Sequence, residues 1–399
     1  MIAPEPFFKA RGTPFSILHR LRALSRLNHS VDLVTYHLGE DVDIPNVNIH
    51  RSSRLPFIKQ IDIGPSYTKI ILDLFLLMKA WRLLIKNKYE CIHTHEEAGV
   101  FGAMLSKIFN LPHIYDMHSS IPEQLVNYNF TKIGFLLKLA NLGERWTLSK
   151  SDVVIAVCPY LKDLINKMGF TGKVVVIENI PISQYKENTP QEEINKLKEE
   201  FSLKRDSFNI VYTGNFECNQ GIDLLIESIP LVIKDNMKVK FLLVGGEAHQ
   251  IEYLRRKIHY LGATEKVIFS GKRPPKQIPV FMDLAEVLVS PRKIGNNVPL
   301  KVYTYLAAGK PIVATKIPAH TQVLNEEVAM LTEANPEAFA EGILAVLRDK
   351  QLRNRLGERT RRLAEEIYSY SDYLAKIKEV CDHIVKGETF SEMAMNGEK

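Results

Sequence analysis

The sequence of 399 residues contains few cysteines and none of the patterns that would give them a structural role. There is no C-x-x-C pair, so the sequence predicts neither a disulfide framework nor a structural zinc site, and it suits a reducing cytoplasm. The N-terminus lacks a basic region followed by an apolar run, so no secretory signal peptide is expected. The absence of a G-x-G-x-x-G fingerprint argues against a nicotinamide cofactor.

The sequence also lacks an uninterrupted apolar run long enough to span a bilayer. Residues 69–86 come closest, but Asp73, Lys79 and Arg82 interrupt them, and each charge is costly at a bilayer centre. Two interpretations remain open. The segment is either an amphipathic helix buried on one side against a sheet, or a helix lying on a membrane surface. In the second case the side chains near the lipid headgroups would be Lys69, Lys79, Arg82, Lys86 and Lys88.

The composition is that of an ordinary globular protein, with 45% hydrophobic and 25% charged residues. The net charge is +6, and most of the excess lies in residues 1–180, which carry 21 basic and 16 acidic side chains. No basic stripe with interleaved aromatic residues is present, so no nucleic-acid partner is expected. A mild positive excess suits small anionic ligands or an anionic membrane surface.

Strand-like and helix-like segments alternate twice along the chain, which indicates two series of βαβ units with parallel sheets. We therefore predict an α/β fold of two Rossmann-like domains facing an interdomain cleft. Strands are expected at 1–4, 31–36, 90–94, 112–116 and 153–157, and again at 209–213, 240–244, 267–270, 287–290 and 311–314. Helices are expected at 14–27, 69–86, 99–109, 223–233, 250–261, 299–308, 336–348 and 351–385.

The domain boundaries follow from the composition of the connecting segments. We predict an N-terminal, acceptor-side domain over residues 1–180 and a linker over 181–206 that contains a solvated helix. A C-terminal nucleotide-sugar domain is expected over 207–367, a helix returning to the N-terminal domain over 368–386, and a disordered tail over 387–399.

The segment 290–315, SPRKIGNNVPLKVYTYLAAGKPIVAT, predicts an anion site at a helix N-terminus. A flexible turn of Gly295, Asn296 and Asn297 leads to Pro299, which suits the first helical position because its missing N–H costs nothing there. Three cations flank the turn: Arg292, Lys293 and Lys301. The alternative is a plain strand–loop–helix connection with surface charges.

This segment resembles the nucleotide-sugar site of the family-4 glycosyltransferases, which have the GT-B fold. Four further stretches agree with the resemblance: RGTPFS at 11–16, HTHEEAG at 93–99, YDMHSS at 115–120 and YTGNFECNQGIDLLIES at 212–228. The resemblance implies a retaining enzyme that moves a hexose from a nucleoside-diphosphate sugar to a hydroxyl acceptor, such as a lipid-linked or surface-glycan precursor. It further implies that no protein-bound metal or other cofactor is needed, and that the leaving phosphate accepts the acceptor's proton.

Four positions depart from the pattern of the family. Asn296 and Thr304 stand where two glutamates, eight positions apart, usually bind the donor sugar and the ribose. Asn215 and Gln220 stand where an arginine and a lysine usually neutralise the diphosphate. We expect Arg292 and Lys301 to compensate for the two missing cations.

By the resemblance, His118 lies beside the reacting sugar carbon, and Asp116 orients this histidine or the acceptor. The H-x-H-E-E sequence at 93–97 leaves three interpretations open: a metal site, a cleft lining, or satisfied core histidines. We expect Gly12 and Thr13 to approach the donor phosphate or the acceptor through backbone N–H groups. The other predicted donor-binding residues are Gly214, Asn215, Gln220, Gly245, Glu247, Lys272, Arg273, Arg292, Asn296, Asn297, Val298, Leu300, Lys301 and Thr304.

Two other functions fit the same scaffold. A nucleotide-sugar 2-epimerase would need carboxylates for acid–base work at the sugar, and residues 296 and 304 do not supply them. A GT-B protein that binds a nucleotide sugar or a partner without catalysis is suggested by the four departures. We expect a cytoplasmic location, with peripheral association at an anionic inner membrane face through residues 69–88.

Overall fold

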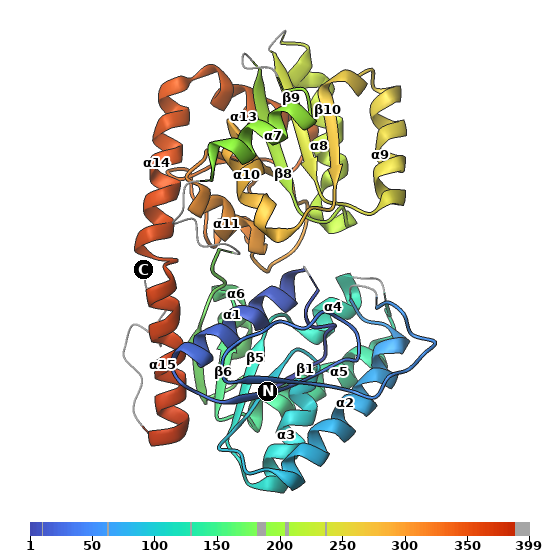
Figure 1. Cartoon of the computed structure of the whole chain (residues 1–399), viewed down its shortest axis with the longest axis vertical. Helices are drawn as coiled ribbons and strands as arrows, with labels where there is room; N and C mark the ends of the chain where they lie inside the picture. The colour runs from blue at the N-terminus through green and yellow to red at the C-terminus, as the bar shows by residue number, and fades with distance from the viewer. Residues whose placement is uncertain are drawn as a thin grey trace. The chain divides into compact units, whose positions relative to one another are not determined.

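The computed structural model describes residues 1–9, 11–61, 64–127, 130–181, 189–203, 207–235 and 238–387. The chain forms two compact units, each with its own parallel sheet (Figure 1). Unit 1 comprises Met1–Asn179 and the C-terminal helix, and unit 2 comprises Ile180–Ser369.

Unit 1 contains a seven-stranded sheet in which every pair of neighbouring strands is parallel. Its strands are, in spatial order, β3 (Val47–Arg51), β2 (Val31–Thr35), β1 (Ile2–Ala3), β4 (Ile92–His95), β5 (His113–Met117), β6 (Val153–Ala156) and β7 (Lys173–Val176). The central strands β4, β5 and β6 are buried along their whole length, as expected for a parallel sheet covered on both faces.

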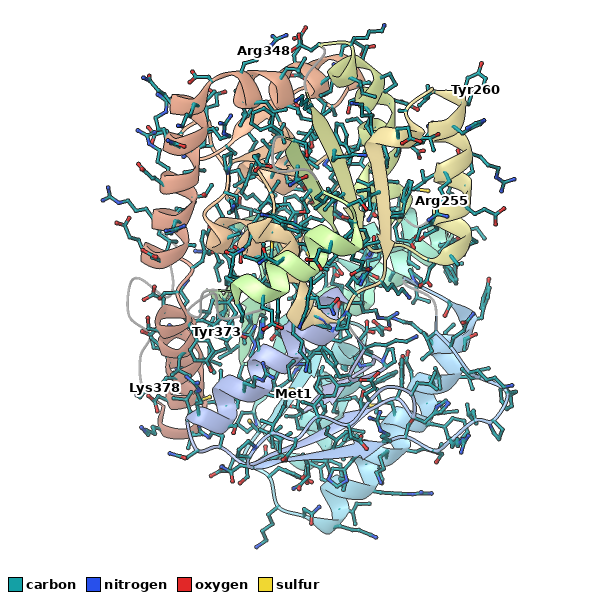
Figure 2. All side chains as sticks on the ribbon, turned by 45° about the horizontal axis from the view of Figure 1, so that its top comes forward. Met1, Arg255, Tyr260, Arg348, Tyr373 and Lys378 are labelled. Carbon is teal, nitrogen blue, oxygen red and sulfur yellow. The ribbon has the colours of Figure 1, made fainter. Side chains whose placement is uncertain are left out.

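The helices of unit 1 are α1 (Gly12–Arg26), α2 (Tyr67–Lys86), α3 (Ala98–Phe109), α4 (Ile121–Asn127), α5 (Gly134–Ser149), α6 (Pro159–Lys167) and α15 (Tyr370–Lys386). α3 packs on β4 and β5 and contacts both α2 and α5, whereas α15 packs on α1. On α15, Tyr373 is buried and Lys378 is exposed (Figure 2). No helix of the described residues is both long enough and apolar enough to cross a bilayer.

Unit 2 contains a six-stranded parallel sheet. Its strands are, in spatial order, β10 (Val267–Gly271), β9 (Val239–Val244), β8 (Phe208–Thr213), β11 (Val287–Ser290), β12 (Ile312–Thr315) and β13 (Met330–Thr332). Its α-helices are α7 (Gln191–Glu200), α8 (Ile222–Ile233), α9 (Ala248–Tyr260), α10 (Ile278–Asp283), α11 (Leu300–Ala308), α12 (Pro318–Thr321), α13 (Pro336–Arg348) and α14 (Lys350–Glu366). One apolar cluster, which includes Ile210, Phe241 and Phe339, forms the core between this sheet and its helices.

The predicted α/β class with two parallel sheets is confirmed. The sequence analysis missed β3, β7 and β13, and all three lie at the edges of their sheets. The single helix predicted over 351–385 is two helices, because the chain leaves helical geometry at Ile367 before α15 begins.

The unit boundaries also differ in detail from the predicted domains. α7, which lies within the predicted linker, belongs to unit 2, and its neighbours 182–188 and 204–206 lie outside the described residues. The tail predicted over 387–399 lies outside them as well, apart from Gly387.

Candidate donor and catalytic sites

The loops at the carboxyl ends of β8, β9 and β11 come together because these strands are neighbours in the sheet of unit 2. Gly245 lies so close to the backbone of Gly214 that an added Cβ would be 1.9 Å from its carbonyl oxygen. Gly221, with φ +70°, lies equally close to the carbonyl oxygen of Pro291. Side chains at these positions would force the loops apart, so glycine is what allows them to meet.

Lys301 supplies the cation of this loop cluster. Its ammonium nitrogen is buried and has no hydrogen-bond partner among the described residues. The nitrogen lies 3.9 Å from the centre of the Tyr212 ring and 3.0 Å from the place where a Cβ on Gly214 would be. Burial, followed by the positive charge of Arg292, lowers the pKa of Lys301 well below its usual range. An anion bound beside Gly214 would give this amine the partner that the protein itself does not provide.

The helix behind this loop begins one residue later than predicted. Pro299 has extended backbone angles and precedes α11, so it is the N-cap residue rather than the first helical residue. No side chain caps this helix, and α11 therefore presents N–H groups of its first turn next to Lys301. This geometry fits the predicted anion site.

Arg292 is turned back onto its own loop. Its Nε donates to the carbonyl oxygen of Ile294 over 2.9 Å, and its Nη1 donates to that of Asn297 over 3.2 Å. The guanidinium lies against Gly295, where a Cβ would be 2.8 Å from Nη2. Arg292 therefore shapes the loop and adds positive charge near Lys301, whereas the sequence analysis expected it to contact the phosphate directly.

The residues that replace the four charged groups of the family have local partners. Asn215 accepts a hydrogen bond from the Tyr212 hydroxyl through its backbone oxygen, over 2.6 Å, and Gln220 donates to the side chain of Asn219. The carbonyl oxygen of Asn296 accepts a hydrogen bond from the Gln322 side chain. Thr304 is buried and donates to the carbonyl of Leu300 within α11. Val298 is also buried, and Leu300 begins α11.

The remaining predicted donor residues of unit 2 divide into two groups. Lys272 and Glu247 form an exposed ion pair beside the N-terminus of α9, where Glu247 and Gln250 form a capping box. Arg273 pairs with Glu200 and lies over the Phe201 ring, 5.2 Å from its centre. Arg273 thus links α7 to the segment after β10 through an ion pair. The sequence analysis did not predict this structural role.

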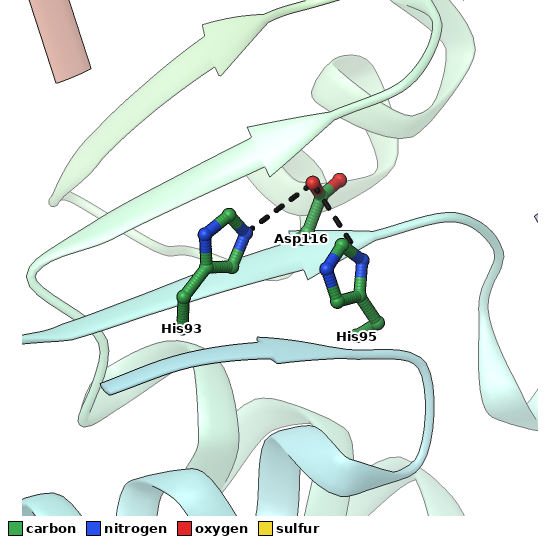
Figure 3. Close-up of side chains that lie close together, drawn as sticks. All are labelled: His93, His95 and Asp116. Carbon is green, nitrogen blue, oxygen red and sulfur yellow. Dashed lines mark ion pairs between the residues drawn. The ribbon is translucent and has the colours of Figure 1, made fainter. Parts of the chain in front are cut away.

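In unit 1, Asp116 lies at the centre of a buried cluster of three histidines and one arginine. Arg20 donates from Nε to Asp116 Oδ2 over 2.8 Å. His93 Nε2 and His95 Nδ1 lie 3.4 and 3.7 Å from the same oxygen (Figure 3), and His118 Nε2 lies 3.5 Å from Oδ1. His118 and His95 are also joined by a hydrogen bond of 2.9 Å between ring nitrogens. The predicted pair of Asp116 and His118 is therefore part of a larger network.

The charges of this cluster are settled by burial and by Arg20. Burial alone would raise the pKa of Asp116, but the Arg20 charge beside it holds the pKa well below its usual range. Burial lowers the pKa of His93, His95 and His118, although Asp116 favours their charged forms. At neutral pH the cluster is a carboxylate paired with a guanidinium and surrounded by neutral imidazoles.

The same cluster offers three donor atoms, from His93, His95 and Asp116, within 4.8 Å of one another. A divalent cation held there would share Asp116 Oδ2 with the Arg20 guanidinium, and two cations would face each other in a buried site. The donor set therefore does not fit a resident metal ion. The alternative of satisfied core histidines is met only in part: His95 Nδ1 is hydrogen-bonded to His118, but His93 Nε2 and His95 Nε2 have no hydrogen-bond partner among the described residues.

Glu96 connects this cluster to the start of α1, and the sequence analysis did not assign it a role. It follows β4 in a left-handed backbone conformation, with φ +50°. Its carboxyl group accepts hydrogen bonds from Thr13 over 3.4 Å and from Ser119 and Gln124 over 3.1 Å each. Burial, followed by the charge of Glu97, raises the pKa of Glu96 to about 8. The neighbouring Gly12 is exposed at the first turn of α1, which no side chain caps.

Both halves of the chain match described families. Residues 11–180 match Glycosyltransferase Family 4, and residues 207–349 match Glycosyl transferases group 1. The chain belongs to the family-4 glycosyltransferases. Its two parallel sheets are those of the GT-B fold, so the resemblance seen in the sequence is confirmed.

Relatives of this glycosyltransferase are distant in sequence. A glycosyltransferase of Methanocaldococcus jannaschii is 23% identical over 88% of this chain and 89% of its own length. The mannosylfructose-phosphate synthase of Agrobacterium fabrum is 25% identical over 76% of this chain and 71% of its own. The alpha-monoglucosyldiacylglycerol synthase of Streptococcus pneumoniae is 20% identical over 63% of this chain and 57% of its own.

Solved structures agree with the fold over nearly the whole chain. Sucrose-phosphate synthase from Thermosynechococcus elongatus superposes with a TM-score of 0.79, at 19% identity over 97% of this chain and 99% of its own. HepE from Anabaena, solved in complex with UDP-glucose, has a TM-score of 0.73, at 17% identity over 96% and 98%.

Proposed function

We propose that this glycosyltransferase is a retaining hexosyltransferase whose donor is a nucleoside-diphosphate sugar. The observation that carries the proposal is the buried, unpartnered ammonium of Lys301 beside Gly214 and the uncapped N-terminus of α11. A diphosphate would accept hydrogen bonds from both, and its negative charge would offset the cost of burying the lysine. The complex of HepE with UDP-glucose supports a donor of this class.

In the reaction we propose, the bond between the sugar carbon and the diphosphate breaks, and a bond to the acceptor oxygen forms on the same face. The acceptor's proton passes to an oxygen of the leaving phosphate. Lys301 and the N–H groups of α11 stabilise the charge that develops on that leaving group. We propose that no resident metal ion is required, because a fixed lysine and helix N–H groups already supply positive charge.

We assign the acceptor side to unit 1. There His118 is held by Asp116 and His95, and the proposed role of His118 is to lie beside the reacting carbon. Gly12 and Thr13 lie at the open first turn of α1, next to the Glu96 carboxyl group, where hydroxyl groups of an acceptor would find donors and an acceptor atom. We propose a lipid-linked or surface-glycan precursor as acceptor, and a cytoplasmic location at the inner membrane face.

The test is a thermal-shift series with UDP-, GDP-, ADP- and dTDP-sugars, followed by turnover measurements with the sugar that binds. A ligand that binds only the folded state raises the melting temperature. We expect one nucleotide class to do so and its sugar to be released or transferred. His118→Ala is expected to keep the thermal shift and to lose turnover, because its contact strengthens mainly in the transition state.

Two results would contradict the proposal. Binding without any turnover would leave a non-catalytic binding protein, and isomerisation of the donor sugar without transfer would indicate an epimerase. Equal turnover in His118→Ala would assign this histidine to the core.

A further inference from the structure

The exposed apolar side chains are concentrated on one part of the molecule. Among the described residues, 20 large apolar side chains are exposed, and 16 of them lie between Phe57 and Trp146 in unit 1. The largest groups are on α2 and α5. Unit 2 exposes only Tyr253, Tyr260 and Ile294 within its described residues. A concentration of this kind marks an interaction surface rather than the scattered apolar residues of ordinary surfaces.

α2 presents an apolar stripe outward and buries Lys69 and Asp73, whereas its Arg82 and Lys86 stay exposed. Its exposed face has apolar side chains at spacings of three and four residues; Ile70 is 62% and Leu74 57% exposed. The stripe consists of Tyr67, Ile70, Ile71, Leu74, Met78, Trp81 and Ile85. On the opposite face Lys69 pairs with Glu97 over 3.1 Å, and Asp73 accepts from the Tyr36 hydroxyl over 2.6 Å. The sequence analysis placed Lys69 near lipid headgroups in its membrane-surface interpretation, and this was wrong, because Lys69 is buried against Glu97.

α5 repeats the pattern. Phe135, Leu139, Leu142 and Trp146 form an exposed stripe, in which Phe135 is 73% and Leu142 63% exposed. The acidic residue of this helix, Glu144, is buried and accepts hydrogen bonds from the Ser120 hydroxyl and the Ile121 N–H. Both helices therefore bury their acidic side chain and present an apolar stripe outside, with exposed basic residues beside it. A soluble surface helix presents a polar face to the solvent instead.

The two stripes meet at their N-terminal ends. The ring of Tyr67 at the start of α2 contacts that of Phe130 just before α5, with centroids 5.1 Å apart. α3 contacts both helices. We call this surface, made by the exposed stripes of α2 and α5, the α2–α5 face.

The charge around the α2–α5 face has one sign. Between residues 67 and 150, the described part of the chain exposes eight basic side chains and a single acidic one, Glu90. The basic residues are Arg82, Lys86, Lys88, Lys107, Lys132, Lys138, Arg145 and Lys150. A second copy of this chain, docked through the same face, would bring like charges together. An apolar stripe with a basic rim instead complements an anionic lipid surface. The apolar side chains would contact the acyl chains, and the basic side chains would pair with the anionic headgroups.

We propose that the α2–α5 face docks the glycosyltransferase onto a bilayer containing anionic lipids, with α2 and α5 lying in the interface. This inference rests on the proposed function, since a lipid-linked acceptor is presented at such a surface. Glu97, the residue after Glu96, pairs with Lys69 on the buried side of α2, so the segment that carries Glu96 packs behind this helix. Docking through α2 and α5 would therefore hold the acceptor side of unit 1 near the membrane.

The experiment is co-sedimentation with vesicles of phosphatidylcholine alone and of phosphatidylcholine mixed with phosphatidylglycerol. The wild type is expected to bind the mixed vesicles, and high salt is expected to weaken binding without abolishing it, because only the basic rim is screened. Leu74→Asn with Leu142→Asn should lower partitioning about tenfold or more, since each leucine contributes apolar burial. Arg82→Gln with Arg145→Gln should lower it by about 25-fold on mixed vesicles only, at about fivefold for each charge.

The matched control is Tyr253→Asn with Tyr260→Asn, which removes exposed apolar side chains from unit 2 and should leave vesicle binding unchanged. A nucleotide-induced thermal shift in each variant shows that it is folded. Two results would overturn the proposal: wild type that stays in the supernatant with both vesicle types, or a dimer in solution that Leu74→Asn with Leu142→Asn dissociates. Vesicle binding without donor turnover would instead refute the proposed function and leave the docking surface standing.

Discussion

At the scale of single residues, Lys301 shows how burial turns a common surface residue into a candidate ligand group. Replacement by methionine keeps most of the side-chain volume and removes the amine. We expect Lys301→Met to melt higher than wild type without ligand, because the substitution removes a buried amine that has no hydrogen-bond partner. Nucleotide affinity should fall about ten- to a hundredfold, because a charged hydrogen bond is lost.

The control for this variant is Lys293→Met, which removes an exposed lysine from the same loop. It should change neither the melting temperature nor the affinity, both measured by thermal shift and calorimetry. Undiminished nucleotide affinity in Lys301→Met would place the diphosphate elsewhere.

Glu96 gives the stability of unit 1 a dependence on pH. Because burial raises its pKa to about 8, the folded protein keeps this proton at neutral pH, whereas the unfolded chain releases it at lower pH. The contribution of Glu96 to the free energy of unfolding is therefore highest in acid and decreases as the pH rises through about 8. Glu96→Gln imitates the protonated group and should remove this decrease.

The measurement is the melting temperature between about pH 5 and about pH 9. We expect wild type and Glu96→Gln to melt alike at the acid end and the variant to melt higher at the alkaline end. Glu358→Gln, at an exposed position, should follow wild type throughout. Curves for Glu96→Gln and wild type that stay parallel over the whole range would mean that Glu96 is charged in the folded protein.

At the scale of elements, the hydrophobic pattern identified the central strands of each sheet and the edge strand β10, but it missed the edge strands β3, β7 and β13. β3 contains Asn48, His50 and Arg51 within five residues, and a strand at an edge needs no second apolar face. β13 has only three residues. These segments form strands because a neighbouring strand pairs with them. Their own residues show no pattern that predicts this pairing.

For α2 the hydrophobic pattern predicted the element correctly but not its orientation. Its apolar residues occupy nearly every direction around the helix axis, so its sequence predicts a helix without saying which side faces the core. The side that faces the core is determined by two interactions: Glu97 forms an ion pair with Lys69, and the Tyr36 hydroxyl donates a hydrogen bond to Asp73. Elements far apart in the sequence thus decide that the apolar stripe faces outward.

At the scale of the whole molecule, the chain leaves unit 1 at Asn179, forms unit 2, and returns to unit 1 through α15. The ring of Tyr373 lies 5.3 Å from the guanidinium carbon of Arg20, the residue that holds Asp116. The last helix of the chain therefore supports the candidate catalytic cluster near its beginning.

We predict that Tyr373→Ala destabilises unit 1 selectively, by about 3–5 kcal/mol, since a buried aromatic side chain is lost. Hydrogen exchange should accelerate in α1 and β5 and stay unchanged in α8 of unit 2. Lys378→Ala, on the exposed face of the same helix, serves as the control and should change neither. Equal acceleration in both units would show that they unfold as one.

The sequence by itself determined the α/β class, the two βα series, the family and the loop that carries Lys301. These features depend on local periodicity and short motifs, which neighbouring residues specify. Only the tertiary structure decided that Lys301 is buried without a hydrogen-bond partner, that Arg292 bonds to its own loop, that Arg273 pairs with α7, and that Arg20 neutralises Asp116. The outward direction of the apolar stripes of α2 and α5 was decided in the same way. Burial and charge pairing depend on which distant segments pack together, and no local pattern in the sequence records that.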